Sequence, residues 1–234
     1  MLTAAIRTIL GYVAVSLYVL VVAPIGMGLA LLFGVPGLLY VLGHFGVRLG
    51  LGIVGIRYRI EGTPRLDRSA VYCANHQSNV DPPILFHVLH PRMRVLYKHE
   101  LDKIPILPRA FRMGGFIPVD RHNREAAIRS VEQGAQALRD GQSFLIFPEG
   151  TRSRTDELLP FKKGGFIMAI RAQAPIVPVA IHGGRDAMRK GTWIIYPALV
   201  TIRVGDPIET AGLVVDDRNA LIAKTREQIL RMLV

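Results

Sequence analysis

The sequence predicts an α/β fold, with a central mixed sheet flanked by helices and preceded by an N-terminal, membrane-embedded helical hairpin. Two observations support this prediction. Between Arg7 and Arg48 the chain carries no Asp, Glu, Lys or Arg. Beyond this segment, short apolar stretches alternate with stretches of helical periodicity, which is typical of a sheet covered by helices. We therefore expect a membrane-anchoring hairpin at 1–55 and an α/β domain at 56–234.

The apolar segment 8–43 is longer than the ~20 residues of one spanning helix and short for two spans with a turn. Proline removes a helix donor, so Pro24 and Pro36 predict two helices with a break. Arg7 and Arg48 flank the segment, and the positive-inside tendency then places both ends on the cytoplasmic side of the cell (inner) membrane. A cleaved signal peptide is the alternative, but the stretch exceeds the usual ~7–15-residue apolar core.

The α/β part is predicted from local signals along the chain. Asp81 is followed by two prolines, which predicts a helix start with Asp81 as its N-cap. Asn123 is the expected N-cap of a helix that runs to Asp140, and Gly141 ends it. Other expected strands are 56–61, 69–74, 94–97, 143–147, 176–181 and 200–204, and other expected helices are 166–172 and 217–233.

The net charge of +11, from 29 basic and 18 acidic residues, calls for an anionic partner. Nucleic acid is not expected, because the chain has no zinc-ligand spacing and no aromatic RNA-binding signature. Membrane phospholipids fit better, since each Lys or Arg near an anionic surface contributes ~1 kcal/mol. A solvated basic surface is the plainer alternative.

The single cysteine, Cys73, excludes an intramolecular disulfide. It lies in the apolar run 70–74, so core packing is favoured over a nucleophilic role. His87 and His90 share a helix face, but no third ligand accompanies them. We expect no metal and no cofactor.

The segment NHQSNVD (75–81) places a histidine beside a carboxylate. The ordinary histidine pKa of about 6.5 suits proton transfer near neutrality, so His76 is the candidate general base. Asp81 would accept a hydrogen bond from the other ring nitrogen and stabilise the imidazolium. Without further motifs, a turn histidine and a capping aspartate are the simpler interpretation.

The segment FPEGTRS (147–153) follows an apolar strand and collects groups suited to holding an anion. Arg152 can grip a phosphate through two N–H groups, and Thr151 adds a hydroxyl. Gly150 permits a positive φ or a close backbone approach. Glu149 is expected to hold an arginine or a hydroxyl of the substrate rather than an anion.

These two segments, with GGFIPVDR (114–121) between them and VPVAI (177–181) after them, resemble the four blocks of the PlsC-like glycerolipid acyltransferase family. The resemblance covers roughly residues 57 to 210 and is greatest to the 1-acyl-glycerol-3-phosphate acyltransferases. It implies transfer of a fatty acyl group from acyl-CoA or acyl carrier protein to the sn-2 hydroxyl of 1-acyl-sn-glycerol-3-phosphate (lysophosphatidic acid), which makes phosphatidic acid.

The resemblance also implies roles for two more cations. Arg121 matches the arginine of the second block, and together with Arg152 it would bind the acceptor phosphate. Lys98 resembles a family lysine that precedes this block. Pro118 lies within this block and has no backbone N–H, so the backbone at this position cannot donate a hydrogen bond to a phosphate.

Three alternatives remain open on the sequence. The acceptor could be another lysolipid. A thioesterase would use the same base to activate water, and a lipid-binding module without enzymatic activity would not need the pair of His76 and Asp81.

Overall fold

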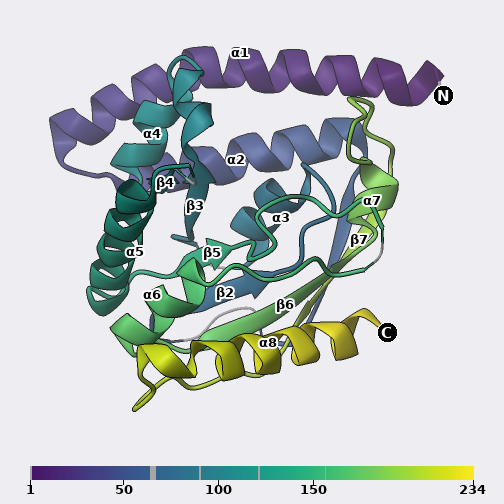
Figure 1. The fold of residues 1–234 in the computed structure, drawn as a ribbon. Coiled ribbons are helices and arrows are strands. Elements are labelled where there is room, and N and C mark those ends of the chain that lie inside the picture. Colours follow the sequence, from purple (N-terminus) through teal and green to yellow (C-terminus); the bar gives the residue numbers. More distant parts are fainter. Residues whose placement is uncertain (1, 64–66, 90, 121, 156) are drawn as a thin grey trace.

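In a computed structural model, described for residues 2–63, 67–89, 91–120, 122–155 and 157–234, a seven-stranded sheet forms the centre of the molecule (Figure 1). The strand order is β1-β7-β6-β2-β5-β3-β4. The strands are β1 Arg57–Glu61, β2 Val71–Ala74, β3 Arg94–Lys98, β4 Ile117–Val119, β5 Phe144–Ile146, β6 Ile176–His182 and β7 Leu199–Val204.

The sheet is mixed, as predicted. β6 and β7 are antiparallel, and every other pair of neighbouring strands is parallel. Consequently β2, β3, β4, β5 and β6 all point their carboxyl ends toward one edge of the sheet. In open α/β sheets this edge is where ligands bind.

Helices cover both faces of the sheet. α3 (Asp81–Val88) lies on one face, and α5 (Arg124–Arg139), α6 (Gly164–Ala172) and α8 (Arg218–Leu233) lie on the other (Figure 1). The shorter helices are α4 Leu107–Met113, α7 Gly184–Ala187, and the 3₁₀ turns η1 His99–Lys103 and η2 Val215–Asp217.

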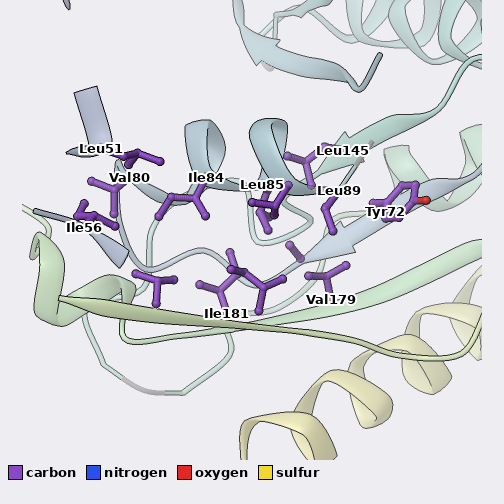
Figure 2. Close-up of a cluster of buried hydrophobic side chains, with 14 of the residues drawn as sticks. Leu51, Ile56, Tyr72, Val80, Ile84, Leu85, Leu89, Leu145, Val179 and Ile181 are labelled. Carbon is purple, nitrogen blue, oxygen red and sulfur yellow. The ribbon is translucent and has the colours of Figure 1, made fainter. Parts of the chain in front are cut away.

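β2 shows why two separate apolar cores form. Successive side chains of a strand point to opposite faces. Tyr72 therefore packs with α3, whereas Val71 and Cys73 pack on the side of α5 and α6. In Figure 2, Ile84 and Leu85 of α3 face the strands of the first core. Both are almost fully buried, and burial of such a side chain stabilises the fold by ~1.5–3 kcal/mol.

Two N-terminal apolar helices pack against each other, which confirms the predicted hairpin. α1 spans Leu2–Phe33 and α2 spans Gly37–Val54, and both are long and apolar enough to cross a membrane by length and composition. The break lies at Gly34, which has a φ of 64°. Pro24, expected to contribute to the break, lies inside α1 instead.

Small residues let the two helices approach closely. A Cβ atom at Gly46 of α2 would lie 2.7 Å from the Tyr18 ring of α1. At Gly11, a Cβ would lie 2.7 Å from a methyl group of Val54. Glycine at such positions is the usual device for close packing of apolar helices.

The hairpin lies along the α/β part of the molecule (Figure 1). Leu51 and Val54 of α2 belong to the first apolar core. Thr8 of α1 accepts a hydrogen bond from the Ile195 N–H at 2.9 Å, and the Tyr40 hydroxyl donates to the Gly114 carbonyl at 2.6 Å. The proposed domain boundary at residue 55 therefore falls within a packed interface and stays a prediction.

The side of α1 that faces away from α2 is apolar and exposed. At its N-terminal end, Leu2 is 76% exposed, and Leu32 is 75% exposed near its other end. Further exposed apolar side chains of this helix are Ile6, Ile9, Leu10, Val13, Leu17, Leu20, Val21, Ile25 and Leu29. An apolar surface of this extent marks an interface with lipid or with another protein.

Candidate active site

The predicted functional residues follow the carboxyl ends of parallel strands. His76 comes two residues after β2, and Glu149 comes three residues after β5. Lys98 ends β3. Arg121 follows β4 in the sequence but lies outside the described residues. The strand order thus brings residues from distant parts of the chain to one edge.

His76 and Asp81 form the predicted pair. The ring Nδ1 of His76 lies 3.0 Å from Oδ2 of Asp81. The same oxygen accepts the backbone N–H groups of Gln77 at 2.8 Å and Ser78 at 2.7 Å. A neutral imidazole that donates from Nδ1 keeps its lone pair on Nε2, so the geometry prepares Nε2 to accept a proton.

The expectation that Asp81 caps its helix is wrong. α3 begins at Asp81 itself, and no side-chain capping bond is present at this end. The carboxylate turns back to the preceding turn because three donors meet there. Burial also separates the two roles: the Asp81 side chain is fully buried, while 15% of the His76 side chain remains exposed. The ring of His76 lies against Phe147, with 4.3 Å between the centroids.

Glu149 ties the two motifs together. One carboxylate oxygen accepts the His76 N–H at 2.7 Å, and the other accepts the Leu159 N–H at 2.9 Å. The Ser153 N–H in turn donates to the His76 carbonyl at 2.8 Å. Burial raises the pKa of the Glu149 carboxyl, and these two N–H groups together with nearby His76 oppose that shift. Among the described residues these two backbone N–H groups, and not the expected Arg152, donate to Glu149, and contact with a substrate hydroxyl stays a prediction.

The loop 150–152 is shaped for polar contacts. Gly150 adopts a φ of 71°, which confirms the expected left-handed conformation. Arg152 carries a buried Nη1 atom that has no hydrogen-bond partner within the described part of the chain. A buried donor of this kind needs an explanation, and a role in binding an anion is one.

Lys190 contacts the same loop. Its Nζ donates to the Thr151 hydroxyl at 3.0 Å and to the Arg152 carbonyl at 2.8 Å. An ammonium group has three donors, so one remains for a ligand. Sequence reasoning missed Lys190, because it lies outside the motifs and its partners are 38 and 39 residues away.

Asn75 and Ser78 fix the turn that carries His76 to β6 and to the segment that follows it. The Asn75 side chain donates to the Ile181 carbonyl at 3.0 Å and accepts from its N–H at 2.7 Å. The Ser78 hydroxyl donates to the Met188 carbonyl at 2.8 Å. The side chains of Asn75 and Ser78 therefore orient the turn that carries His76.

Lys98 and Cys73 differ from the rest of the site. Lys98 is 56% exposed and pairs with Glu100 at 2.8 Å, and this hydrogen bond is the main cause that lowers the Glu100 pKa to about 2. Cys73 is buried, and its burial, followed by the charge of Glu149, raises the thiol pKa well above its ordinary value. A neutral thiol in a core is a poor nucleophile. Among the described residues, no cluster of three or more His, Cys, Asp or Glu side chains could hold a metal ion.

A family model described as Acyltransferase matches residues 56–182, which include both motifs and more than half of the chain. A 1-acyl-sn-glycerol-3-phosphate acyltransferase of Haemophilus influenzae is 33% identical over 169 residues, covering 72% of this chain and 70% of the relative. The chain belongs to this acyltransferase family. The matched range contains both the His76–Asp81 pair and the loop 150–152.

Two further comparisons bear on the extent of the likeness. A 1-acyl-sn-glycerol-3-phosphate acyltransferase of Limnanthes douglasii is 34% identical over 175 residues, which are 74% of this chain but only 62% of the plant relative. The crystal structure of the 1-acyl-sn-glycerophosphate acyltransferase of Thermotoga maritima matches with a TM-score of 0.84 and 23% identity, covering 98% of this chain and 94% of that one. This family member therefore has that fold, hairpin included.

Proposed function

We propose that the protein transfers a fatty acyl group from a thioester to the sn-2 hydroxyl of 1-acyl-sn-glycerol-3-phosphate, which produces phosphatidic acid. The observation that carries the proposal is the hydrogen bond of His76 Nδ1 to the buried Asp81. Next to this pair lies the loop that contains Arg152 and that Lys190 contacts. The names of the relatives favour this acceptor.

The proposed reaction proceeds in two steps. Nε2 of His76 takes the proton of the acceptor hydroxyl while the oxygen attacks the thioester carbonyl, and Asp81 stabilises the imidazolium that forms. The tetrahedral intermediate then collapses, the carbon–sulfur bond breaks, and the imidazolium returns its proton to the leaving thiolate. Because the thioester is already activated, no covalent acyl-enzyme is required.

The acceptor phosphate would be held by Arg152 and Lys190, with Arg121 and Lys98 as further candidates. Arg152 of the loop 150–152 and Lys190, which contacts this loop, match the charge of a phosphate monoester, and Arg152 has an unused buried donor within the described part of the chain. A charge-assisted hydrogen bond contributes ~1.5–3 kcal/mol. The acyl donor, acyl-CoA or acyl carrier protein, brings its own phosphate, and both would approach from the exposed side of His76.

The hairpin would anchor the protein in one leaflet of the inner membrane, with the active site facing the cytoplasm. α1 and α2 lie along the α/β part, which supports a shallow position that keeps the charged surface of the protein in water (Figure 1). The exposed apolar side of α1 would enter the acyl-chain region. A lysolipid could then reach His76 without its acyl chain leaving the membrane.

An acceptor screen tests the proposal. Purified protein receives labelled acyl-CoA or acyl-carrier protein, with lysophosphatidic acid, glycerol-3-phosphate, a neutral lysolipid or water alone as acceptor. We expect label in phosphatidic acid only with lysophosphatidic acid, and none with His76→Ala. Release of labelled free fatty acid without any acceptor would instead identify a thioesterase. Preference for a neutral lysolipid would contradict the acceptor assignment.

A further inference from the structure

Two adjacent glycines, Gly183 and Gly184, follow β6, and a side chain is excluded at each of them for a different structural reason. Gly183 has a φ of 84°, and a Cβ atom there would collide with the Leu199 carbonyl oxygen. Gly184 has no positive φ, so its backbone would accept any L-residue. What forbids a side chain at Gly184 is Asp81: an added Cβ would lie well within 3.0 Å of its Oδ1 atom.

The Cβ atom added at Gly184 would collide with Oδ1 of Asp81. Oδ1 is buried and has no hydrogen-bond partner in the part of the chain that the structure describes. Oδ2 accepts all three bonds, from His76 Nδ1 and from the Gln77 and Ser78 N–H groups. The two oxygens belong to one rigid carboxylate, so pushing Oδ1 away also moves Oδ2 and its bond to His76.

Neither side of this contact can retreat easily. The turn that carries His76 is fixed to β6 by the double hydrogen bond of Asn75 with Ile181. It is fixed beyond α7 by the bond of the Ser78 hydroxyl to Met188. Gly184 lies between these two attachment points, and its added Cβ would also lie 3.5 Å from the Ser78 Cβ.

We propose that Gly184 is a positioning residue for the catalytic pair, because its bare backbone sets the place of the Asp81 carboxylate and thereby the orientation of His76. This inference rests on the proposed function only for its kinetic consequence. The structural consequence, loss of the hydrogen bond between His76 and Asp81, can be measured without turnover.

The test compares Gly184→Ala with Gly164→Ala. Gly164 begins α6, and its added Cβ would make an ordinary 3.6 Å contact with Val131. Displacement of a catalytic group by about 1 Å costs on the order of 10²-fold in rate. We expect kcat to fall by that order in Gly184→Ala, with little change in acceptor KM, and both constants to remain near wild type in Gly164→Ala.

A double-mutant cycle separates positioning from general damage. If Gly184 acts through Asp81, adding Gly184→Ala to Asp81→Ala should cost nothing further in kcat, because the atom it strikes is gone. The same cycle in thermal stability covers a variant that folds poorly: adding Gly184→Ala should then lower the Tm of Asp81→Ala by less than it lowers the Tm of the wild type. Additive losses in both cycles would overturn the proposal.

The third measurement needs no activity. Selective ¹⁵N-histidine NMR of the full chain in detergent reports the Nδ1 proton of His76, assigned with His76→Gln. We expect this signal to be lost or shifted in Gly184→Ala and retained in Gly164→Ala. An unchanged signal in folded Gly184→Ala would refute the positioning role, even if the protein proves to have another activity. A wild type that shows the signal but no acyl transfer would refute the proposed function alone.

Discussion

Oδ2 of Asp81 collects three donors, so the orientation of His76 depends on one oxygen atom. The Gln77 and Ser78 N–H groups hold the Asp81 carboxylate in place. The imidazole that donates to this fixed acceptor therefore rotates less easily than one with a mobile partner. In the proposed mechanism the same carboxylate also supplies the negative charge that would stabilise the imidazolium formed when Nε2 takes a proton. Geometry and charge thus act through one contact.

Asp81→Asn separates these two contributions. The amide oxygen can still accept the Gln77 and Ser78 N–H groups, but the charge is lost and the preferred tautomer of His76 changes. We expect kcat to fall by ~10²–10⁴-fold in Asp81→Asn and in His76→Ala, since this is the usual contribution of a general base. Vesicle binding by both variants should remain normal. Near-normal turnover in purified His76→Ala would remove His76 from the mechanism.

Lys190→Met tests the acceptor site. Loss of a charge-assisted contact of ~1.5–3 kcal/mol should lower kcat/KM for lysophosphatidic acid by roughly 10- to 150-fold. The matched control is Arg189→Met, which removes the same charge from an exposed neighbour. An acceptor without phosphate should be affected little by either change. Equal loss with both acceptors would show that Lys190 only supports the loop.

The site was predictable where local sequence decides the geometry. His76, Asp81 and Gly150 lie in short turns after strands, so their spacing is enough to place them together. Lys190 was missed because its contacts depend on how the chain returns after β6. The capping role assigned to Asp81 was wrong for a different reason: local donors on both sides compete for its carboxylate, and those of the preceding turn bind it.

At the scale of elements, the contact of α2 with α3 joins the hairpin to the sheet. The ring of His44 stacks on Phe86 at 4.6 Å, and His87 lies 5.5 Å from His44. Tyr58 of β1 meets the His87 ring edge-on at 5.8 Å. Burial, followed by the nearby His44 and Arg48 of α2, lowers the pKa of His87 below its ordinary value.

This shift predicts a pH dependence of stability. The unfolded chain, with an ordinary histidine pKa of about 6.5, binds a proton on His87 more readily than the folded chain does. The stabilisation is therefore present above about pH 6.5 and is lost as pH falls through the folded pKa. We expect urea unfolding in detergent to show a smaller loss of stability from pH 7 to 5 in His87→Gln than in wild type. An equal loss of unfolding free energy from pH 7 to 5 in both proteins would contradict this role of His87.

Secondary-structure elements were predicted correctly where local sequence signals mark their ends, and they were missed where tertiary packing determines them. The helix after Asn123 was predicted because the cap and the terminator are both local, and the Asn123 side chain does accept the Ala126 N–H. α4 was not predicted: it is seven residues long and begins after Ile106, which has a φ of 71°. The pairing of β1 with β7 joins segments about 140 residues apart, which no local pattern encodes.

For the whole molecule, the hairpin and the α/β part pack against each other. α1 would be on the order of 48 Å long at 1.5 Å per residue, longer than the ~30 Å hydrocarbon core of a bilayer. Its contacts are spread along its length: Thr8 bonds to Ile195, and Tyr18 packs closely against Gly46 of α2. This arrangement fits a helix that lies in the membrane surface better than one that crosses it.

Thiol labelling tests this orientation. Val35 lies in the break between the helices and is 46% exposed, so Val35→Cys places a thiol at the hairpin tip. An impermeant reagent added outside intact spheroplasts should leave it unlabelled. Val214→Cys, on the 61% exposed Val214 of the α/β part, should become labelled once cells are lysed. Native Cys73 is buried and should not interfere. Labelling of Val35→Cys from outside would establish two true spans.

The hydrogen bond of Thr8 with Ile195 also sets an order of events during biosynthesis. The two residues are 187 positions apart, and at ~5–20 residues per second the ribosome needs roughly 10–40 s between them. During that interval α1 has left the ribosome, but the backbone groups that receive Thr8 do not yet exist. α1 and α2 can therefore pack against each other first, and the α/β part completes its folding against a hairpin that is already present.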